Sequence, residues 1–172
     1  MSTLNAMQND IGLGVAVNAD QYLTFMLDGE EYGVDILRVQ EIKGWGKVTS
    51  IPGTPAYVHG VMNLRGTIVP ILDLRKRFDM EQIDYGPTTV VIVLRIESEG
   101  CDRIMGIVVD AVSDVYAVPA EELRSSPDFG GNVHVDFVRG LATVDEKMVI
   151  ILNIDRLLNT DDLEVAVEAG KR

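Results

Sequence analysis

The chain repeats one pattern of short apolar segments, and this repeat limits the folds open to it. A stretch in the first half, YVHGVMNL followed by IVPILDL, returns in the second half as FVRGLATV followed by MVIILNI. The matched segments are 57–64 with 137–144 and 68–74 with 148–154. Upstream of them, Gly33 matches Gly106, and apolar positions again fall on apolar positions. Any two β-rich segments align loosely, but here the glycine register and the element order agree as well, which indicates an internal duplication.

Each copy of the repeat consists of about five short β-like segments. The segment QYLTFML at 21–27 is aromatic and apolar, and Asp28-Gly29 after it is typical of a two-residue hairpin turn. A unit of roughly 65–70 residues lies near the lower limit for a self-sufficient core, so we expect the two units to pack on each other. Closely spaced strands predict a mainly β protein made of small barrels or sandwiches. The predicted boundaries are a mobile lead at 1–19, a first unit at 20–86, a second unit at 87–158, and a short C-terminal helix with a tail at 159–172.

Three local patterns refine this prediction. Pro70 cannot donate a hydrogen bond to a β-ladder, so we expect an edge or a bulge at this point of its strand. The continuous apolar run at 149–151 predicts a strand that is covered on both faces, with the core between the two units as the cover. Residues 36–44 are ambiguous, because their apolar positions fit a helical spacing and also a strand-like alternation.

Composition excludes several classes of partner. The net charge is −12, from 15 basic and 27 acidic residues, which argues against nucleic acid and against insertion at an anionic membrane surface, since clustered Lys and Arg bind both. No apolar run approaches the roughly 20 residues of a membrane helix, and residues 1–20 lack the basic segment of a secretory signal. A single cysteine, Cys101, excludes an intrachain disulfide. These features predict a cytoplasmic protein.

The residue types that carry catalysis or bind metals do not form a recognisable site. His59 and His134 lack a Cys, Asp or Glu at ligand spacing, and we expect both on the surface. Cys101 lies in an acidic loop, which disfavours a reactive thiolate. Asp73 and Asp110 are the nearest candidates for an acid or a base, but a turn or strand-end role fits each of them better. We therefore expect no metal, no cofactor and no catalysis.

A binding surface remains. Two small units with a seam between them offer a groove for a peptide or a helix. Arg65 lies at the turn of an otherwise apolar hairpin, where a planar guanidinium can hold a partner's carboxylate or helix-end carbonyls at two points. The alternative is an exposed arginine paired with an acid of the same chain, for example Glu41. The aligned residue of the second copy is Asp145, so we expect the two units to present unlike charge.

Several stretches of the chain resemble the CheW family of bacterial chemotaxis coupling proteins. The motifs are GEEYGVDILRVQEIKG at 29–44, TPAYVHGVMNLRGTIVPILDLRKRF at 54–78, TTVVIVL at 88–94 and GIVVDAVSDV at 106–115. The resemblance covers the chain from about Gln21 to about Asn159. It implies two SH3-like five-stranded β-barrels packed together, and no enzyme activity. It also implies an adaptor that couples the cytoplasmic tips of chemoreceptors (methyl-accepting chemotaxis proteins) to the regulatory domain of the CheA histidine kinase in membrane-associated arrays.

The resemblance further implies two sets of contact residues. For the receptor tip, which family members bind in the groove between the barrels, the residues are Val39, Glu41, Arg65, Val90 and Val112. The aliphatic members of this set suit apolar contact, and the charged members suit the setting of register. For the kinase, in the stretch LRSSPDF, the residues are Arg124, Asp128 and Phe129. Phe129 has an alternative role as a loop residue that packs back onto the second unit.

Two other functions stay open. One is a scaffold of the same fold in a non-chemotaxis two-component kinase pathway, which only the identity of the partners separates from chemotaxis. The other is an enzyme of an unrecognised class that uses the groove. A carboxylate or histidine with a strongly shifted pKa in a pocket would favour the enzyme.

Overall fold

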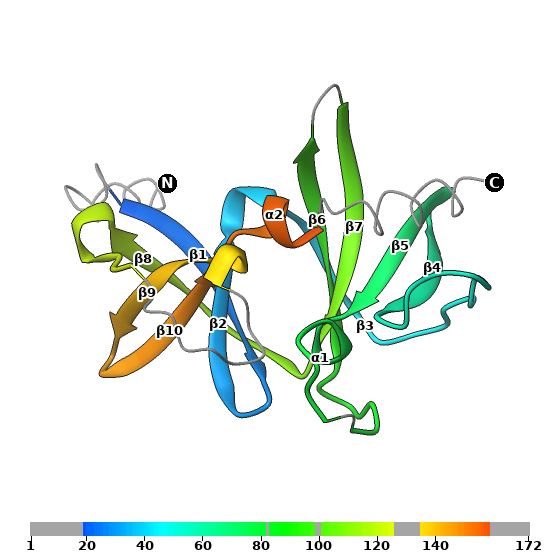
Figure 1. The fold of residues 1–172 in the computed structure, drawn as a ribbon, viewed down its shortest axis with the longest axis horizontal. Helices are drawn as coiled ribbons and strands as arrows, with labels where there is room; N and C mark the ends of the chain where they lie inside the picture. The colour runs from blue at the N-terminus through cyan, green and yellow to red at the C-terminus, as the bar shows by residue number, and fades with distance from the viewer. Residues whose placement is uncertain (1–18, 82, 99–100, 126–134, 159–172) are drawn as a thin grey trace, which may run out of the picture.

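The structure, a computed structural model, describes residues 19–81, 83–98, 101–125 and 135–158. The strands of these ranges form two five-stranded sheets that lie side by side and pack together (Figure 1). Sheet 1 contains, in spatial order, β8 (Ala111–Pro119), β1 (Ala19–Leu27), β2 (Glu30–Asp35), β10 (Lys147–Leu152) and β9 (Val138–Val144). Sheet 2 contains β3 (Val39–Gly44), β6 (Val90–Ser98), β7 (Cys101–Val109), β5 (Thr67–Asp73) and β4 (Val58–Leu64). The predicted class, mainly β with two five-stranded units packed together, is confirmed.

Helical segments are short in the described part of the chain. They are α1 (Leu74–Arg77), α2 (Ile154–Leu158), and the 3₁₀ turns η2 (Ile36–Arg38), η3 (Ala120–Glu122) and η4 (Val135–Phe137). The ambiguous residues 36–44 thus form a 3₁₀ turn followed by a strand. The predicted lead, apart from Ala19, and the predicted C-terminal helix and tail lie outside the described residues.

The internal repeat relates the two sheets to each other. Replacing each strand of sheet 1 by its counterpart in the other half (β1 by β6, β2 by β7, and so on) gives the strand order of sheet 2. Each sheet therefore combines the first hairpin of one half with the last three strands of the other half. The prediction that residues 20–86 and 87–158 form separate units is wrong, because β1–β2 and β6–β7 each complete the sheet of the opposite half.

Two parallel strand contacts make this exchange of hairpins possible. β2 pairs with β10, with Gly33 opposite Ile151, and β7 pairs with β5, with Gly106 opposite Ile71. A Cβ atom at either glycine would lie 2.8 Å from the Cδ1 atom of that isoleucine. Glycine at these matched positions therefore lets strands of unlike halves approach each other.

The hairpin that contains Arg65 is confirmed as β4 and β5. Arg65 and Gly66 form its turn with φ angles of 51° and 90°, and Asp145 and Glu146 form the matching β9–β10 turn with φ angles of 51° and 66°. Two consecutive positive φ angles are typical of the type I′ turn, which suits the twist of a two-residue hairpin. The expectation for Pro70 is confirmed at that point of the strand: β5 lies inside sheet 2, but its pairing with β7 starts only at Ile71, so Pro70 pairs with β4 alone.

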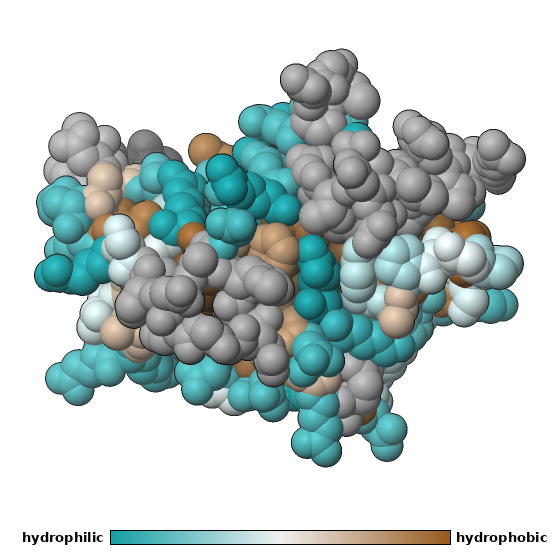
Figure 2. Space-filling model, in the orientation of Figure 1, coloured by the Kyte–Doolittle hydropathy of each residue, from teal (hydrophilic) through white to brown (hydrophobic). Residues whose placement is uncertain are grey.

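The main apolar cluster lies between the sheets and draws on both of them, with Phe25, Phe78 and Ile92 among its fully buried members. Each sheet also has a smaller cluster of its own. The run at 149–151 is covered on both faces as predicted, since Val149 and Ile151 belong to the cluster of sheet 1 while Ile150 packs against the central cluster. Figure 2 shows a largely hydrophilic face, with apolar surface near the middle, where the sheets meet.

Along the described strands, the chain passes from one sheet to the other at two places. Crossover 1 is η2, which joins β2 of sheet 1 to β3 of sheet 2. Crossover 2 is Asp110, which joins β7 of sheet 2 to β8 of sheet 1. These two crossovers lie at matched places in the repeat, so they are where the two halves of the chain exchange their hairpins.

Candidate partner-binding surface

Arg65 and Glu41 form an ion pair at the end of sheet 2. The Nη2 atom of Arg65 donates a short hydrogen bond to Oε1 of Glu41, and Nη1 lies 3.5 Å from Oε2. The hydrogen bond from Arg65 is the main cause that holds the pKa of Glu41 below its usual value. The alternative pairing named from the sequence is therefore confirmed. The arginine side chain is still 76% exposed, so the guanidinium edge away from Glu41 is open to a partner.

The ion pair borders a small cavity at the end of sheet 2. The cavity has a volume of about 210 Å³. Its lining residues are Gln40, Glu41, Leu64, Arg65, Thr67, Val69, Val93 and Ile104. Leu64, Val69 and Val93 are buried and apolar, so the charged pair lies over an apolar floor. Such a combination suits one aliphatic side chain flanked by a polar contact.

The three valines of the predicted receptor set lie elsewhere, at the rim of the central core. Val39, Val90 and Val112 are each half-buried and pack against the cluster between the sheets. Val39 is the first residue after crossover 1, and Val112 follows crossover 2 by two positions. Thr88, near Val90, donates from Oγ1 to the carbonyl oxygen of Asp110 at 2.9 Å. The valines therefore mark the seam between the sheets.

A shift in strand pairing separates the valines from the ion pair. Val39 lies opposite Leu94 of the central cluster, whereas Glu41 lies opposite Val93 of the sheet 2 cluster, with a bulge between them. The bulge turns the two side chains toward different clusters, because an extra residue reverses the alternation of the strand. Of the five predicted residues, Glu41 and Arg65 pair on sheet 2, while Val39, Val90 and Val112 pack against the central cluster from three different strands; β3 carries both Val39 and Glu41.

The predicted kinase set is described only in part. Arg124 follows η3, and its backbone exchanges two hydrogen bonds with Leu141 of β9, at 2.9 and 2.7 Å. This isolated bridge fixes the backbone of Arg124, and the residue is still exposed to solvent. Asp128 and Phe129 lie outside the described residues.

The corresponding end of sheet 1 carries a different charge, as Asp145 in the sequence predicts. Asp145 occupies the turn position that matches Arg65, and Asp114 lies on the strand β8 that matches the β3 strand of Glu41. Burial raises the pKa of Tyr116 at this end, and the nearby carboxylates of Glu31, Asp114 and Asp145 raise it further. The two ends of the molecule are therefore electrically unlike.

The histidine and carboxylate predictions have mixed outcomes. His59 is not a surface residue: it is half-buried, with Nδ1 3.3 Å from the Tyr85 hydroxyl and its ring edge-on to Trp45. Burial lowers its pKa. Asp73 has the predicted strand-end role, because it accepts a hydrogen bond from the backbone N–H of Arg75 at 2.9 Å, as the N-cap of α1. His134 lies outside the described residues.

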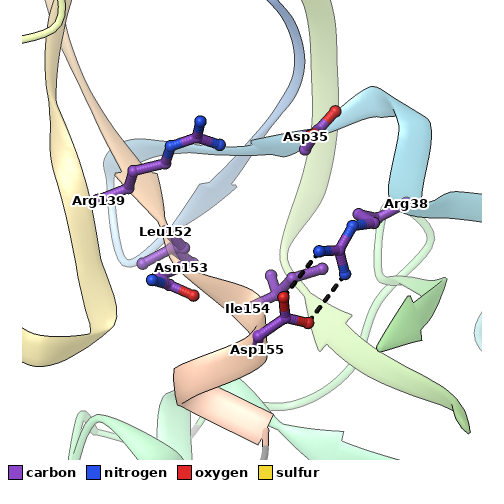
Figure 3. A pocket seen from close by; sticks show the side chains of 7 residues that line it. All are labelled: Asp35, Arg38, Arg139, Leu152, Asn153, Ile154 and Asp155. Atoms are coloured by element: carbon purple, nitrogen blue, oxygen red, sulfur yellow. Dashed lines mark hydrogen bonds and ion pairs between the residues drawn. The ribbon is translucent and has the colours of Figure 1, made fainter. Parts of the chain in front are cut away.

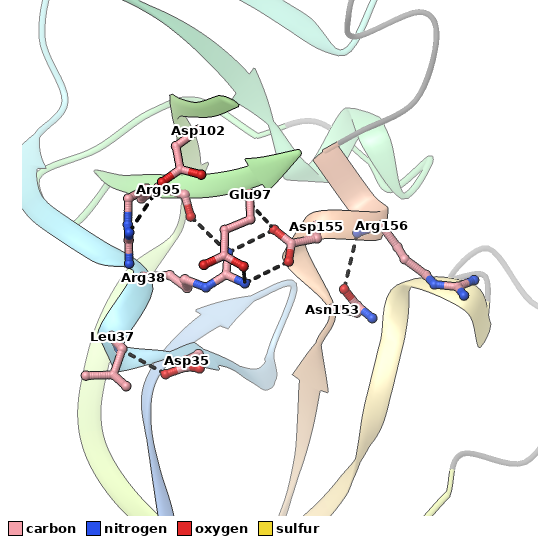
Figure 4. Close-up of polar contacts among 9 residues, drawn as sticks. All are labelled: Asp35, Leu37, Arg38, Arg95, Glu97, Asp102, Asn153, Asp155 and Arg156. Atoms are coloured by element: carbon pink, nitrogen blue, oxygen red, sulfur yellow. Dashed lines mark hydrogen bonds and ion pairs between the residues drawn. The ribbon is translucent and has the colours of Figure 1, made fainter. Parts of the chain in front are cut away.

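Two ion pairs with largely buried arginines were not predicted, because each joins residues far apart in the chain. Arg38 binds Asp155, which is 117 positions away, and Arg75 binds Asp110. Figure 4 shows Arg38 between Asp155 and Glu97. Arg38 and Asp155 also line an open cavity of about 220 Å³ beside Arg139 and Asn153 (Figure 3). The sequence contains one signal that could have pointed to these pairs: the repeat aligns Asp155 with Arg75, a residue of opposite charge.

The described residues also answer two general questions, about metal ligands and about membrane-spanning helices. Within those ranges, no group of three or more His, Cys, Asp or Glu side chains is placed to hold a metal ion. Of the helices that the structure describes, none has the length and apolar content needed to cross a membrane. The fold and the surface thus define a small β-sheet binding module.

Comparison with known proteins gives the family. The model of the CheW-like domain matches residues 21–162. The chemotaxis protein CheW of Klebsiella aerogenes is 43% identical over 151 residues, covering 88% of this chain and 89% of that protein. The probable chemotaxis protein CheW of Rhizobium etli is 33% identical, covering 85% and 92%. The crystal structure of the scaffolding protein TtCheW from Thermoanaerobacter tengcongensis matches with a TM-score of 0.76 and 30% identity, covering 88% of this chain and 95% of that one.

The chain therefore belongs to the CheW family. Its function is that of a coupling adaptor in chemotaxis, a scaffolding protein and not an enzyme.

Proposed function

We propose that this adaptor joins the cytoplasmic tips of transmembrane chemoreceptors to the CheA histidine kinase, in the cytoplasm at membrane-associated arrays. The observation that carries the proposal is the exposed Arg65, paired with the half-buried Glu41 on β3, the strand that also holds Val39 of the seam. Both patches hold the residues that the family resemblance assigns to receptor contact. β3 carries both Val39 and Glu41, which supports a contact surface that includes both patches.

The chemistry of this surface suits a helical partner. Val39, Val90 and Val112 keep part of their side chains accessible at the rim of the core, so a partner's aliphatic side chains gain apolar contact there. Arg65 has guanidinium donors left over after its contact with Glu41, and these reach a carboxylate or a helix-end carbonyl. Apolar contact supplies affinity, and the charged pair fixes register and orientation.

We propose that the kinase contact lies on sheet 1, beside its edge strand β9, around Arg124. Its backbone is held by β9 while its side chain is exposed, which suits a guanidinium presented to a partner. Asp128 and Phe129 complete the proposed kinase set on the strength of the family resemblance alone.

Reversing the charge of Arg65 tests the receptor surface. Arg65→Glu places two carboxylates together at the proposed contact, so we expect the affinity for a purified receptor cytoplasmic fragment to fall by about tenfold or more. The melting temperature is expected to stay close to that of the unchanged protein, because the side chain is exposed. Titration calorimetry measures the first quantity, and circular dichroism measures the second.

Arg95→Glu is the matched control for this experiment. Arg95 is also a partly exposed arginine of sheet 2 with an exposed acidic partner, Asp102, at 3.5 Å. We expect it to bind the receptor fragment normally. Normal binding by Arg65→Glu, or loss of folding in that variant, would contradict the proposed role of Arg65.

A further inference from the structure

Two repeat-related ion pairs brace the crossovers of the chain. At crossover 1, Nη1 and Nη2 of Arg38 donate to Oδ1 and Oδ2 of Asp155 at 2.8 and 2.7 Å. At crossover 2, Nε and Nη2 of Arg75 donate to Oδ1 and Oδ2 of Asp110 at 3.0 and 2.8 Å. Both contacts are two-point, and both arginine side chains are largely buried, with 16% and 8% exposed. Each pair therefore fixes an orientation as well as a distance.

The Arg38–Asp155 pair also binds backbone groups of β6, a strand of sheet 2. Asp155 accepts a hydrogen bond from the N–H of Glu97 at 3.0 Å, and Arg38 donates to the carbonyl of Arg95 at 3.1 Å (Figure 4). Since Asp155 follows sheet 1 and Glu97 belongs to sheet 2, this pair ties the two sheets together.

The second pair has one backbone contact of the same kind and one local contact. Asp110 accepts from the N–H of Asp28 at 2.9 Å, and Arg75 donates to the carbonyl of Glu81 at 2.6 Å. Asp28 lies in the β1–β2 turn of sheet 1, while Arg75 lies in α1, directly after sheet 2. Both pairs thus join a short helix, a crossover and the hairpin of the other sheet.

The charges of the two pairs are reversed. The helical member is an arginine in α1, Arg75, and an aspartate in α2, Asp155, at the matched position. The crossover member is Arg38 in the first half and Asp110 in the second. The first half therefore supplies both arginines and the second half supplies both aspartates, so each pair can form only between unlike halves.

The pairs lie directly beside the valines of the seam. Arg38 is the residue before Val39. Asp110 lies two residues before Val112, and its carbonyl accepts the hydrogen bond from Thr88, which lies two residues before Val90. A displacement of either crossover therefore displaces the neighbouring valines.

We propose that the Arg38–Asp155 and Arg75–Asp110 pairs are positioning devices that set the places of Val39, Val90 and Val112 for binding of the receptor tip. This inference rests on the proposed function, because it takes these valines as contact residues. Buried ion pairs add little net stability over apolar residues of the same size, whereas their two-point geometry fixes where a segment lies. Losing the two-point contact is therefore expected to weaken partner binding in protein that is still folded.

Charge exchange within one pair gives the sharpest test. In Arg38→Asp and in Asp155→Arg, like charges meet at crossover 1, so we expect the affinity for a purified receptor cytoplasmic fragment to fall by about tenfold or more. The double variant Arg38→Asp with Asp155→Arg restores opposite charges and is expected to bind within about threefold of the unchanged protein. Titration calorimetry well below the melting temperature measures these affinities. Arg38→Lys, which keeps the charge but loses the planar fork, serves as a milder variant if a single reversal fails to fold.

A second readout separates positioning from general stability. Carbon-13 methyl spectra of the valines are expected to show Val39 shifted by the Arg38 variants and Val112 unchanged. Arg75→Lys, at the other pair, is expected to shift Val112 and leave Val39 unchanged. A general loss of stability would not divide the two signals in this way. Lys47→Asp, a charge reversal at an exposed residue outside both ion pairs, is the control and is expected to bind normally.

Val39→Asp, measured beside these variants, distinguishes failure of the positioning role from failure of the receptor surface. If it loses binding while folded Arg38→Asp and Arg38→Lys bind normally, the positioning role is overturned and the receptor surface stands. If all three bind normally, the receptor surface itself is overturned, and the positioning role with it. Failure of the double charge exchange to restore binding also overturns the positioning role.

Discussion

Gly33 and Gly106 are the residues on which the pairing of the two halves depends most directly. Each lies opposite an isoleucine of the other half, and a Cβ atom there would force the Cδ1 atom of that isoleucine to shift. Both positions were visible in the sequence as matched glycines. Their role in pairing the two halves could not be predicted, because a repeat shows which residues are equivalent but not which copy of a strand each of them contacts.

Alanine at Gly106 is therefore expected to destabilise the fold. Its Cβ would lie 2.8 Å from both Ile71 Cδ1 and Val91 Cγ1, so we predict a loss of about 1–3 kcal/mol in the free energy of unfolding. Urea unfolding measures this loss, and Ile71→Val in the same chain should recover part of it. Gly44→Ala, where the added atom meets open space, is the control. Equal stability of the Gly44 and Gly106 variants would show that the close approach is not required.

Arg65 illustrates how far residue-level prediction reached. The turn position, the exposure and the pairing with Glu41 were all available from the sequence, because hairpin spacing and charge are local signals. The bulge that turns Val39 and Glu41 toward different clusters was not available, since it depends on the pairing of β3 with β6.

At the scale of elements, the two crossovers depend on ionised aspartates. Hydrogen bonds from Arg38 are the main cause that lowers the pKa of Asp155, against the opposing effect of burial. For Asp110, burial alone would raise the pKa, but hydrogen bonds from Arg75 and from the N–H of Asp28 outweigh it, so its pKa is also lowered. Groups of this kind stabilise the fold above their unfolded pKa, about 3.9, and lose that effect as the pH falls through the folded value.

The lowered pKa of Asp155 predicts how the stability of an Asp155→Asn variant depends on pH. Near neutral pH the variant is expected to be less stable than the unchanged protein, because Arg38 loses its charged partner. As the pH falls below about 4, the unchanged protein loses the same contribution and the difference narrows. Urea unfolding between pH 3 and pH 6 follows this difference. A gap of constant size across that range would contradict the contribution assigned to the carboxylate.

Most strands and the hairpin turns could be predicted from the sequence because alternation and turn residues are local. Residues 21–27, Asp28-Gly29 and the 59–78 hairpin are examples that the structure bears out. The ion pairs at the crossovers could not be predicted, because no spacing rule connects Arg38 with a residue 117 positions away.

At the scale of the whole molecule, the exchanged hairpins mean that neither half contains a complete sheet. Residues 19–86 lack the β6–β7 hairpin that completes sheet 2, and residues 87–158 lack the β1–β2 hairpin that completes sheet 1. The boundary predicted at 86/87 therefore does not coincide with a boundary between the two sheets.

Separate expression of the two halves tests this topology. We predict that fragments 19–86 and 87–158 are each largely unfolded alone and gain β structure when mixed in equal amounts, because each supplies the hairpin that the other lacks. Far-ultraviolet circular dichroism and sedimentation measure the gain. A cooperative unfolding transition in either fragment alone would be incompatible with the exchanged arrangement.

The central claim, that the protein joins receptor to kinase, is tested most directly by reconstitution. Autophosphorylation of a cognate CheA kinase is followed with membrane-bound chemoreceptor, with and without this chain. We predict stimulation only when all three components are present, a fall in the rate when attractant is added, and loss of stimulation with Arg65→Glu. A kinase rate that does not respond to the folded protein in the presence of cognate receptor would contradict the proposed coupling.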